Sequence, residues 1–157
     1  MPRITIQELV HATDGSLISG DLGGSVPSVS IDSRTIPPGA AFFAIRGHRL
    51  DGHQFIKEAA KKGAGAIVVE TLPDDSPPGI PLILVDDTTQ ALGRLAVFHR
   101  QRMNLPVVAV TGSNGKTTTK EMIAHVLATR WQVLKSVGSF NNQWGVPLTL
   151  LRLSPEH

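Results

Sequence analysis

The chain has 157 residues, of which 41% are hydrophobic, enough to bury the core of one domain or of two small ones. Lysine and arginine total 15 against 13 for aspartate and glutamate, so the formal charge of +2 provides no basic face for nucleic acid. Without cysteine there are no disulfides or thiolate metal sites, and no signal peptide or membrane-spanning segment is recognised, so we expect a cytoplasmic protein.

The first 86 residues have the pattern of a small α/β domain. Thr5 and Glu8 have the spacing of a capping box and predict a short helix that ends at Gly15. Turn-rich stretches at 19–28 and 72–81 predict loops. Short apolar runs predict four strands, at 28–31, 40–45, 65–69 and 81–85, with a helix at 51–63 between the second and the third.

A helix is predicted at 88–104, and His99 lies on its apolar face. Because no second metal-ligating residue stands four positions after His99, we interpret it as a core or boundary histidine. Asp86 and Asp87 follow an apolar run, a pattern that also suits a magnesium ligand. The threonines that come next favour capping of the helix instead.

A glycine-rich loop follows a short apolar run at 107–110 and precedes an amphipathic helix. This order of strand, loop and helix is the context of a phosphate-binding loop. Gly112 and Gly115 permit backbone angles that turn N–H groups toward an anion, and the helix adds its positive N-terminal dipole. The apolar face of that helix consists of Met122, Ile123, Val126 and Leu127.

Lys116 and Thr117 match the lysine and the hydroxyl of Gly-Lys-Thr phosphate loops, in which they contact the β and γ phosphates and a magnesium ion. The match is incomplete, because Val110 stands where the usual spacing places the first glycine. A simple turn between a strand and a helix would not require Gly-Lys-Thr, so we favour the phosphate loop.

The form TGSNGKTT at residues 111–118 resembles the ATP loop of the Mur ligases, which build the UDP-muramyl precursor of peptidoglycan, and of the folylpolyglutamate synthases. Residues 30–70 resemble the uridine-binding domain of two Mur ligases, a domain that folylpolyglutamate synthases lack. The TTTKEM and DGHQF forms and residues 138–151 are similar to the member that adds D-alanyl-D-alanine to UDP-N-acetylmuramoyl-tripeptide.

The resemblance implies an α/β fold, with a small mixed α/β uridine-binding domain at residues 1–86. The start of a P-loop, parallel-sheet ATPase domain of the Mur ligase type would follow at 87–157, with strands near 106–110 and 131–135. Because the chain stops at His157, before an acidic magnesium ligand and the amine-substrate domain, we expect a truncated N-terminal portion that does not catalyse ligation alone.

The resemblance also implies the ligands and the residues that bind them. ATP and Mg²⁺ would be the cofactors, with Lys116 and Thr117 catalytic and Thr117 the metal ligand. The partners would be UDP-N-acetylmuramoyl-tripeptide and D-alanyl-D-alanine, without nucleic acid or membrane insertion, and the full-length enzyme would be a monomer. The ATP loop would comprise Gly112, Ser113, Asn114, Gly115, Lys116, Thr117 and Thr118, and the substrate site Ser33, Arg34, His48, Arg49, Asn141 and Asn142.

The implied reaction is ATP-dependent amide ligation through an acyl phosphate, which requires no nucleophilic side chain. Individual residues also suit simpler roles, since Arg34 resembles a solvated surface arginine and paired asparagines form turns. Two alternatives stay open for the chain as a whole: the Mur ligase that adds the third peptide residue, and a non-catalytic module that binds a uridine nucleotide.

Overall fold

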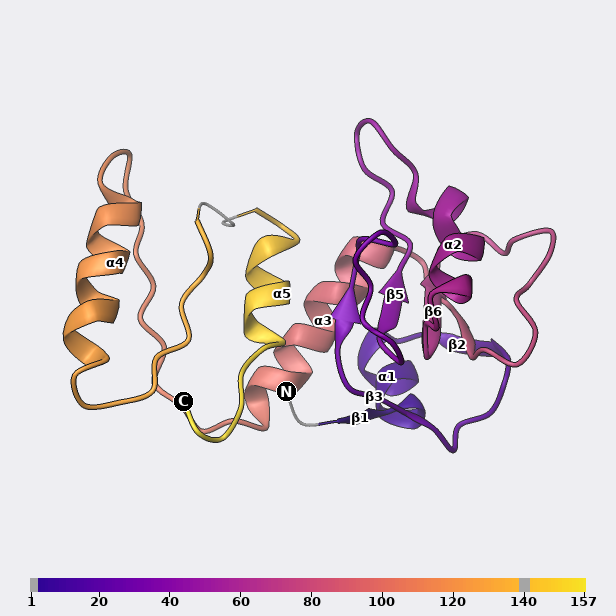
Figure 1. Ribbon diagram of the computed structural model, residues 1–157, viewed down its shortest axis with the longest axis horizontal. Helices are drawn as coiled ribbons and strands as arrows, with labels where there is room; N and C mark the ends of the chain where they lie inside the picture. Colours follow the sequence, from indigo (N-terminus) through magenta and orange to yellow (C-terminus); the bar gives the residue numbers. More distant parts are fainter. Residues whose placement is uncertain (1–2, 139–141) are drawn as a thin grey trace.

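The computed structural model describes residues 3–138 and 142–157 (Figure 1). Its larger sheet has five strands in the order β2-β7-β6-β5-β4. Strands β4 to β7 are parallel, and β2 pairs antiparallel with β7. The four predicted strands and the α/β class are therefore confirmed. The strands are β2 (Ser16–Ser19), β4 (Val29–Ser30), β5 (Ala41–Phe43), β6 (Ala66–Val69) and β7 (Leu82–Leu84).

A separate two-stranded sheet pairs β1 (Ile4–Thr5) with β3 (Ser25–Val26). Strands β1, β2 and β3 are not predicted from the sequence, and β3 lies in a stretch predicted to be a loop. With two residues each, β1 and β3 are too short to show alternation of apolar and polar side chains, so only the pairing between them reveals these strands.

Helices cover both faces of the larger sheet. Phe43 and Val68 pack with α1 and α3 on one face, whereas Phe42 and Ile67 pack with α2 on the other. Neighbouring residues of β5 and β6 thus face opposite layers, which explains why these strands are apolar throughout. The helices are α1 (Ile6–Thr13), the 3-10 helix η1 (Gly52–Phe55), α2 (Ile56–Lys61), α3 (Thr88–Gln101), α4 (Lys116–Leu127) and α5 (Gly145–Leu150).

Both predicted helix caps are confirmed. The Glu8 N–H donates to Thr5 Oγ1 at 3.1 Å, and the Thr5 N–H donates back to Glu8 Oε2 at 2.9 Å. At the start of α3, Asp87 Oδ1 accepts from the Gln90 N–H at 2.9 Å, and this hydrogen bond lowers the pKa of Asp87. Asp87 therefore caps a helix, while Asp86 is exposed beside it.

Helix α3 connects the two parts of the chain. Leu92 and Leu95 are fully buried in the core formed with α1 and the sheet, and α5 packs along α3. His99 Nε2 donates to the Leu153 carbonyl at 3.0 Å, and burial lowers its pKa, so its predicted place in the core is confirmed. The boundary at residues 86 and 87 remains a prediction, although α3 packs into the first core.

The strands expected near 106–110 and 131–135 are not formed by the described residues, and that prediction is wrong. Val107 and Val108 are 57% and 61% exposed, because these segments have no neighbouring strand with which to exchange hydrogen bonds.

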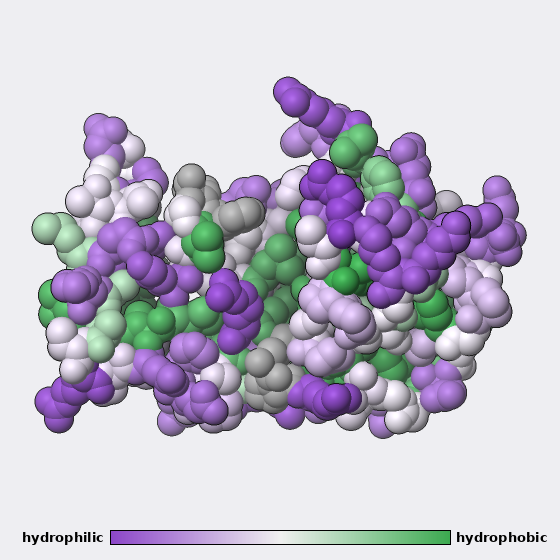
Figure 2. Space-filling view, in the orientation of Figure 1, coloured by the Kyte–Doolittle hydropathy of each residue, from purple (hydrophilic) through white to green (hydrophobic). Residues whose placement is uncertain are grey.

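The apolar face predicted for α4 is also uncovered, with Met122 65% and Val126 66% exposed. Figure 1 shows α4 apart from the sheet, and Figure 2 shows hydrophobic surface between α4 and α5. No helix in residues 3–138 and 142–157 is both long and apolar enough to cross a membrane.

Candidate functional site

The predicted phosphate loop lies at the N-terminus of α4, at the upper end of that helix in Figure 1. Gly112 has a φ of 142° and Gly115 a φ of 74°, and this region favours glycine. Gly115 is the N-cap of α4, and among the described residues no side chain caps this helix end. The first amide groups of α4 are therefore available to an anion.

The Lys116 side chain folds back onto this loop. Its Nζ donates to the Ser113 carbonyl at 3.2 Å and also contacts the Gly112 carbonyl oxygen. A phosphate group in the loop would replace these carbonyls as partners of the ammonium group. The position of Lys116 thus suits binding of a phosphorylated ligand.

Thr117 and Thr118 are exposed in the first turn of α4. A threonine hydroxyl is an oxygen ligand of the kind that magnesium prefers, so Thr117 fits the predicted role as one ligand among several. Within the described parts of the chain, no group of three or more histidine or acidic side chains is placed to hold a metal ion. The metal-binding role of Thr117 stays a prediction.

A groove of about 430 Å³ lies at the carboxyl ends of β4 and β5. Ile31 follows β4, Ile45 follows β5, and Leu50 joins them as apolar lining. His48 and Arg49 line the groove from the exposed loop after β5. In open α/β sheets, ligands bind outside the carboxyl ends of the strands, so the place of this groove suits a ligand site.

Ser33 and Arg34, which are predicted to belong to the same substrate site, do not line this groove. Ser33 is 5% exposed, and its Oγ donates to Glu58 Oε2 of α2 at 2.7 Å. Arg34 pairs with Asp32 at 2.8 Å, and this contact lowers the pKa of Asp32. The structure thus groups His48 with Arg49 only, and all four binding roles remain predictions.

The loop after β5, which carries His48 and Arg49, is called the groove loop. Hydrogen bonds connect the residues that follow it to β6 and α3. His53 Nδ1 donates to Asp51 Oδ1 at 2.6 Å, and His53 Nε2 accepts from the Glu70 N–H at 2.9 Å, which places the ring proton on Nδ1. Partial burial by itself would raise the pKa of Asp51, but hydrogen bonds from His53 and Arg46 outweigh burial and lower this pKa. Glu70 Oε1 accepts from the Thr88 N–H and hydroxyl, each at 2.7 Å.

The segment that begins at Asn142 also reaches the groove, through Trp144. Asn142 Oδ1 accepts from the N–H groups of Trp144 and Gly145, at 3.2 and 2.7 Å, and so holds the start of α5. Trp144 Nε1 donates to Thr89 Oγ1 at 3.0 Å, and the indole lines the groove. Trp144 is not predicted from the sequence as a site residue, because no local pattern relates it to the loop after β5. Asn141 lies outside the described residues.

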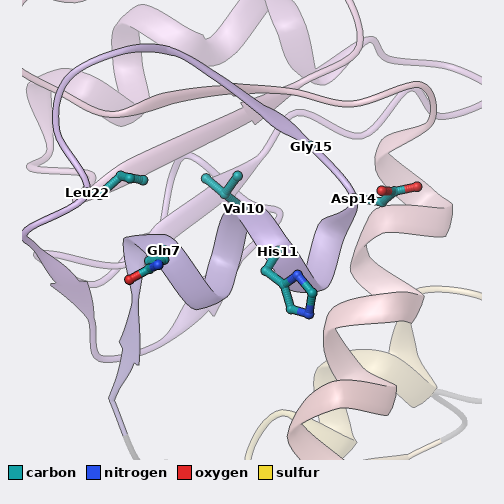
Figure 3. Close-up of a pocket in the computed structure, with 6 residues that line it drawn as sticks. All are labelled: Gln7, Val10, His11, Asp14, Gly15 and Leu22. Carbon is teal, nitrogen blue, oxygen red and sulfur yellow. The ribbon is translucent and has the colours of Figure 1, made fainter.

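Another hollow, of about 320 Å³, lies beside α1 (Figure 3). Leu22 and Val10 lie on its apolar side, with Leu22 pointing toward Val10. Its polar lining comes from Gln7, His11 and Asp14, all of which are exposed to solvent. These groups lack the burial that would make a hydrogen bond to a ligand strong, so we assign no site there.

Two patterns from one known protein family match most of the chain. The pattern described as "Mur ligase family, catalytic domain" matches residues 25–100, and the pattern described as "Mur ligase middle domain" matches residues 110–157. The chain belongs to the Mur ligase family. The predicted family is therefore confirmed, and both the groove loop and the phosphate loop lie in matched regions.

Mur ligases of one kind resemble the chain over its whole length. The UDP-N-acetylmuramoyl-tripeptide--D-alanyl-D-alanine ligase of Escherichia coli (strain K12) is 40% identical over 157 residues, which is 100% of this chain and 34% of that protein. A crystal structure of MurF from Acinetobacter baumannii superposes with a TM-score of 0.91 at 35% identity, covering 100% of this chain and 34% of that one. The chain thus spans about a third of these Mur ligases.

One solved Mur ligase carries a nucleotide. The structure of MurF from Thermotoga maritima in complex with ADP matches with a TM-score of 0.70 at 36% identity, covering 79% of this chain and 28% of that one. These structural matches confirm the predicted Mur ligase type of fold.

Proposed function

We propose that this chain supplies the uridine-nucleotide and ATP sites of a ligase that adds D-alanyl-D-alanine to UDP-N-acetylmuramoyl-tripeptide during peptidoglycan precursor synthesis. The observation that carries the proposal is a glycine-lysine loop at a helix N-terminus and a strand-end groove in one chain that superposes on MurF with a TM-score of 0.91. Cytoplasmic location and a monomeric full-length enzyme are part of the same proposal.

The phosphate loop would hold ATP. The amides at the start of α4 and the Lys116 ammonium group would bind the β and γ phosphates, and Thr117 would contribute one ligand to Mg²⁺. Mg²⁺ in this position supplies positive charge beside the phosphates. Lys116 would stay close to the phosphoryl oxygens as charge shifts among them, which is electrostatic preorganisation.

The ligation reaction that we propose proceeds in two steps. The carboxylate of the UDP-linked substrate takes the γ-phosphoryl group of ATP, which gives an acyl phosphate and ADP. The amine of D-alanyl-D-alanine then attacks the acyl carbon, phosphate leaves, and the amine proton is released. His48 and Arg49 would hold the diphosphate of the nucleotide in the groove, while the apolar side chains after β4 and β5 would contact its base.

A chimera tests this function. The aligned 157 residues of the Escherichia coli relative would be replaced by this chain, and phosphate release would be measured with ATP, magnesium, UDP-N-acetylmuramoyl-tripeptide and D-alanyl-D-alanine. We expect release that requires both substrates and that Lys116→Ala reduces by at least about 10²- to 10³-fold, as is typical for loss of one preorganised donor. The isolated chain should bind UDP and ADP without releasing phosphate.

Three outcomes would contradict the proposal in different ways. Phosphate release that persists in Lys116→Ala would indicate that the loop has only a structural role. Release that requires a dipeptide substrate and an amino acid acceptor instead would assign the chain to the ligase of the third residue. An inactive chimera, together with an isolated chain that binds neither UDP nor ADP, would refute both sites.

A further inference from the structure

Trp144 lines the groove together with the loop that carries His48 and Arg49. A Cβ atom placed on Gly47 would lie 3.6 Å from Cη2 of the indole, so the edge of the ring nearly touches the backbone of that loop. Trp144 is half-buried and packs against the core, while the groove leaves part of its surface accessible. The groove therefore has an aromatic wall from the second matched region of the chain.

Both Trp144 and the residues that follow the groove loop are fixed to the first turn of α3. The indole N–H donates to Thr89 Oγ1 at 3.0 Å. The hydroxyl of the neighbouring residue, Thr88, donates to the Glu70 carboxylate, and the Glu70 N–H in turn donates to the His53 ring. Trp144 is thus positioned before a ligand arrives, and a ring that is already ordered loses little conformational freedom on binding.

We propose that Trp144 is a ligand-binding residue whose indole contacts the flat base of a uridine diphosphate in the groove. This inference rests on the proposed function. The groove combines the cationic and polar side chains of the loop with the aromatic surface of Trp144, which matches a ligand that has a charged diphosphate and a planar base. Arg49 and His48 would contact the diphosphate, and Trp144 would contact the base. Nucleotide binding would then involve both parts of the chain.

Two ligands separate contact with the base from general support of the groove. UDP and inorganic diphosphate would each be titrated calorimetrically into the wild-type chain and into Trp144→Leu, Trp144→Phe and Arg49→Ala. We expect Trp144→Leu to weaken UDP binding about tenfold, the loss typical of removing one aromatic contact with a base, and to leave diphosphate binding unchanged. Trp144→Phe should lose less, and Arg49→Ala should weaken both ligands.

The second tryptophan supplies the control and a second measurement. Trp131 is 57% exposed and does not line the groove, so Trp131→Leu should leave both affinities unchanged. In a Trp131→Phe variant Trp144 is the one remaining tryptophan, and UDP but not diphosphate should change its fluorescence. This measurement serves even where Trp144→Leu fails to fold.

The inference fails, while the proposed uridine site stands, if UDP binding depends on Arg49 but UDP affinity is unchanged in Trp144→Leu. It also fails if Trp144→Leu weakens UDP and diphosphate equally, or if saturating UDP leaves the fluorescence of Trp144 unchanged. If neither UDP nor diphosphate binds to the wild-type chain, the uridine site of the proposed function is refuted, and the inference with it.

Discussion

Gly52→Ala should destabilise the protein at the base of the groove loop. Gly52 follows Asp51, and its N–H donates to the Ile45 carbonyl at 2.9 Å. A Cβ atom at Gly52 would lie 2.7 Å from the carbonyl carbon of Ala44, 2.7 Å from the Ile45 nitrogen and 2.8 Å from the Ile45 oxygen. All three are backbone atoms next to β5, so no side-chain rotation relieves the overlap.

The expected loss follows from these contacts. Relief of the overlap requires the backbone after β5 and the η1 segment to separate, and overpacking of this kind costs about 1–3 kcal/mol. The same movement lengthens the hydrogen bond between Gly52 and Ile45, which contributes about 0.5–1.5 kcal/mol. We therefore expect Gly52→Ala to lower the free energy of unfolding by about 2–4 kcal/mol. Because the groove loop moves with Gly52, UDP affinity should also fall.

Urea unfolding followed by circular dichroism measures this loss. Gly93→Ala is the matched control, because a Cβ at Gly93 in α3 would meet nothing within 4 Å. The control should stabilise the helix by about 0.5–1 kcal/mol, since glycine in a helix interior is less favourable than alanine. A Gly52→Ala protein that unfolds at the wild-type urea concentration would refute the close approach, as would equal destabilisation by both substitutions.

Two further predictions concern single side chains. Burial lowers the pKa of His99 below its ordinary value of 6.5, so the unfolded chain binds a proton at this site first as the pH falls. As the pH is lowered below about 6.5, the free energy of unfolding should therefore decrease, and it should decrease less in His99→Gln. Exposed His125→Gln should behave as wild type. Identical pH profiles for His99→Gln and wild type would contradict this prediction. Asp87→Ala removes the cap bond to Gln90 and should cost about 1 kcal/mol in urea unfolding, while an unchanged midpoint would show that this cap contributes nothing.

Elements with a local signal could be predicted from the sequence alone. Four apolar runs became β4 to β7, and the caps at Thr5 and Asp87 begin their helices as predicted. The signal for the predicted phosphate loop is also local, because its glycines, its lysine and the helix that follows are consecutive residues. The family resemblance rests on the same continuous stretches.

Features that depend on residues far apart in the chain could be seen only in the folded structure. An apolar run such as 106–110 becomes a strand only where another strand supplies its hydrogen bonds, and among the described residues none does. Ser33 and His48 belong to similar polar loops, yet Ser33 bonds to α2 while His48 lines the groove. Trp144 reaches that groove because α5 packs along α3, a contact between residues far apart in the chain, which no local pattern encodes.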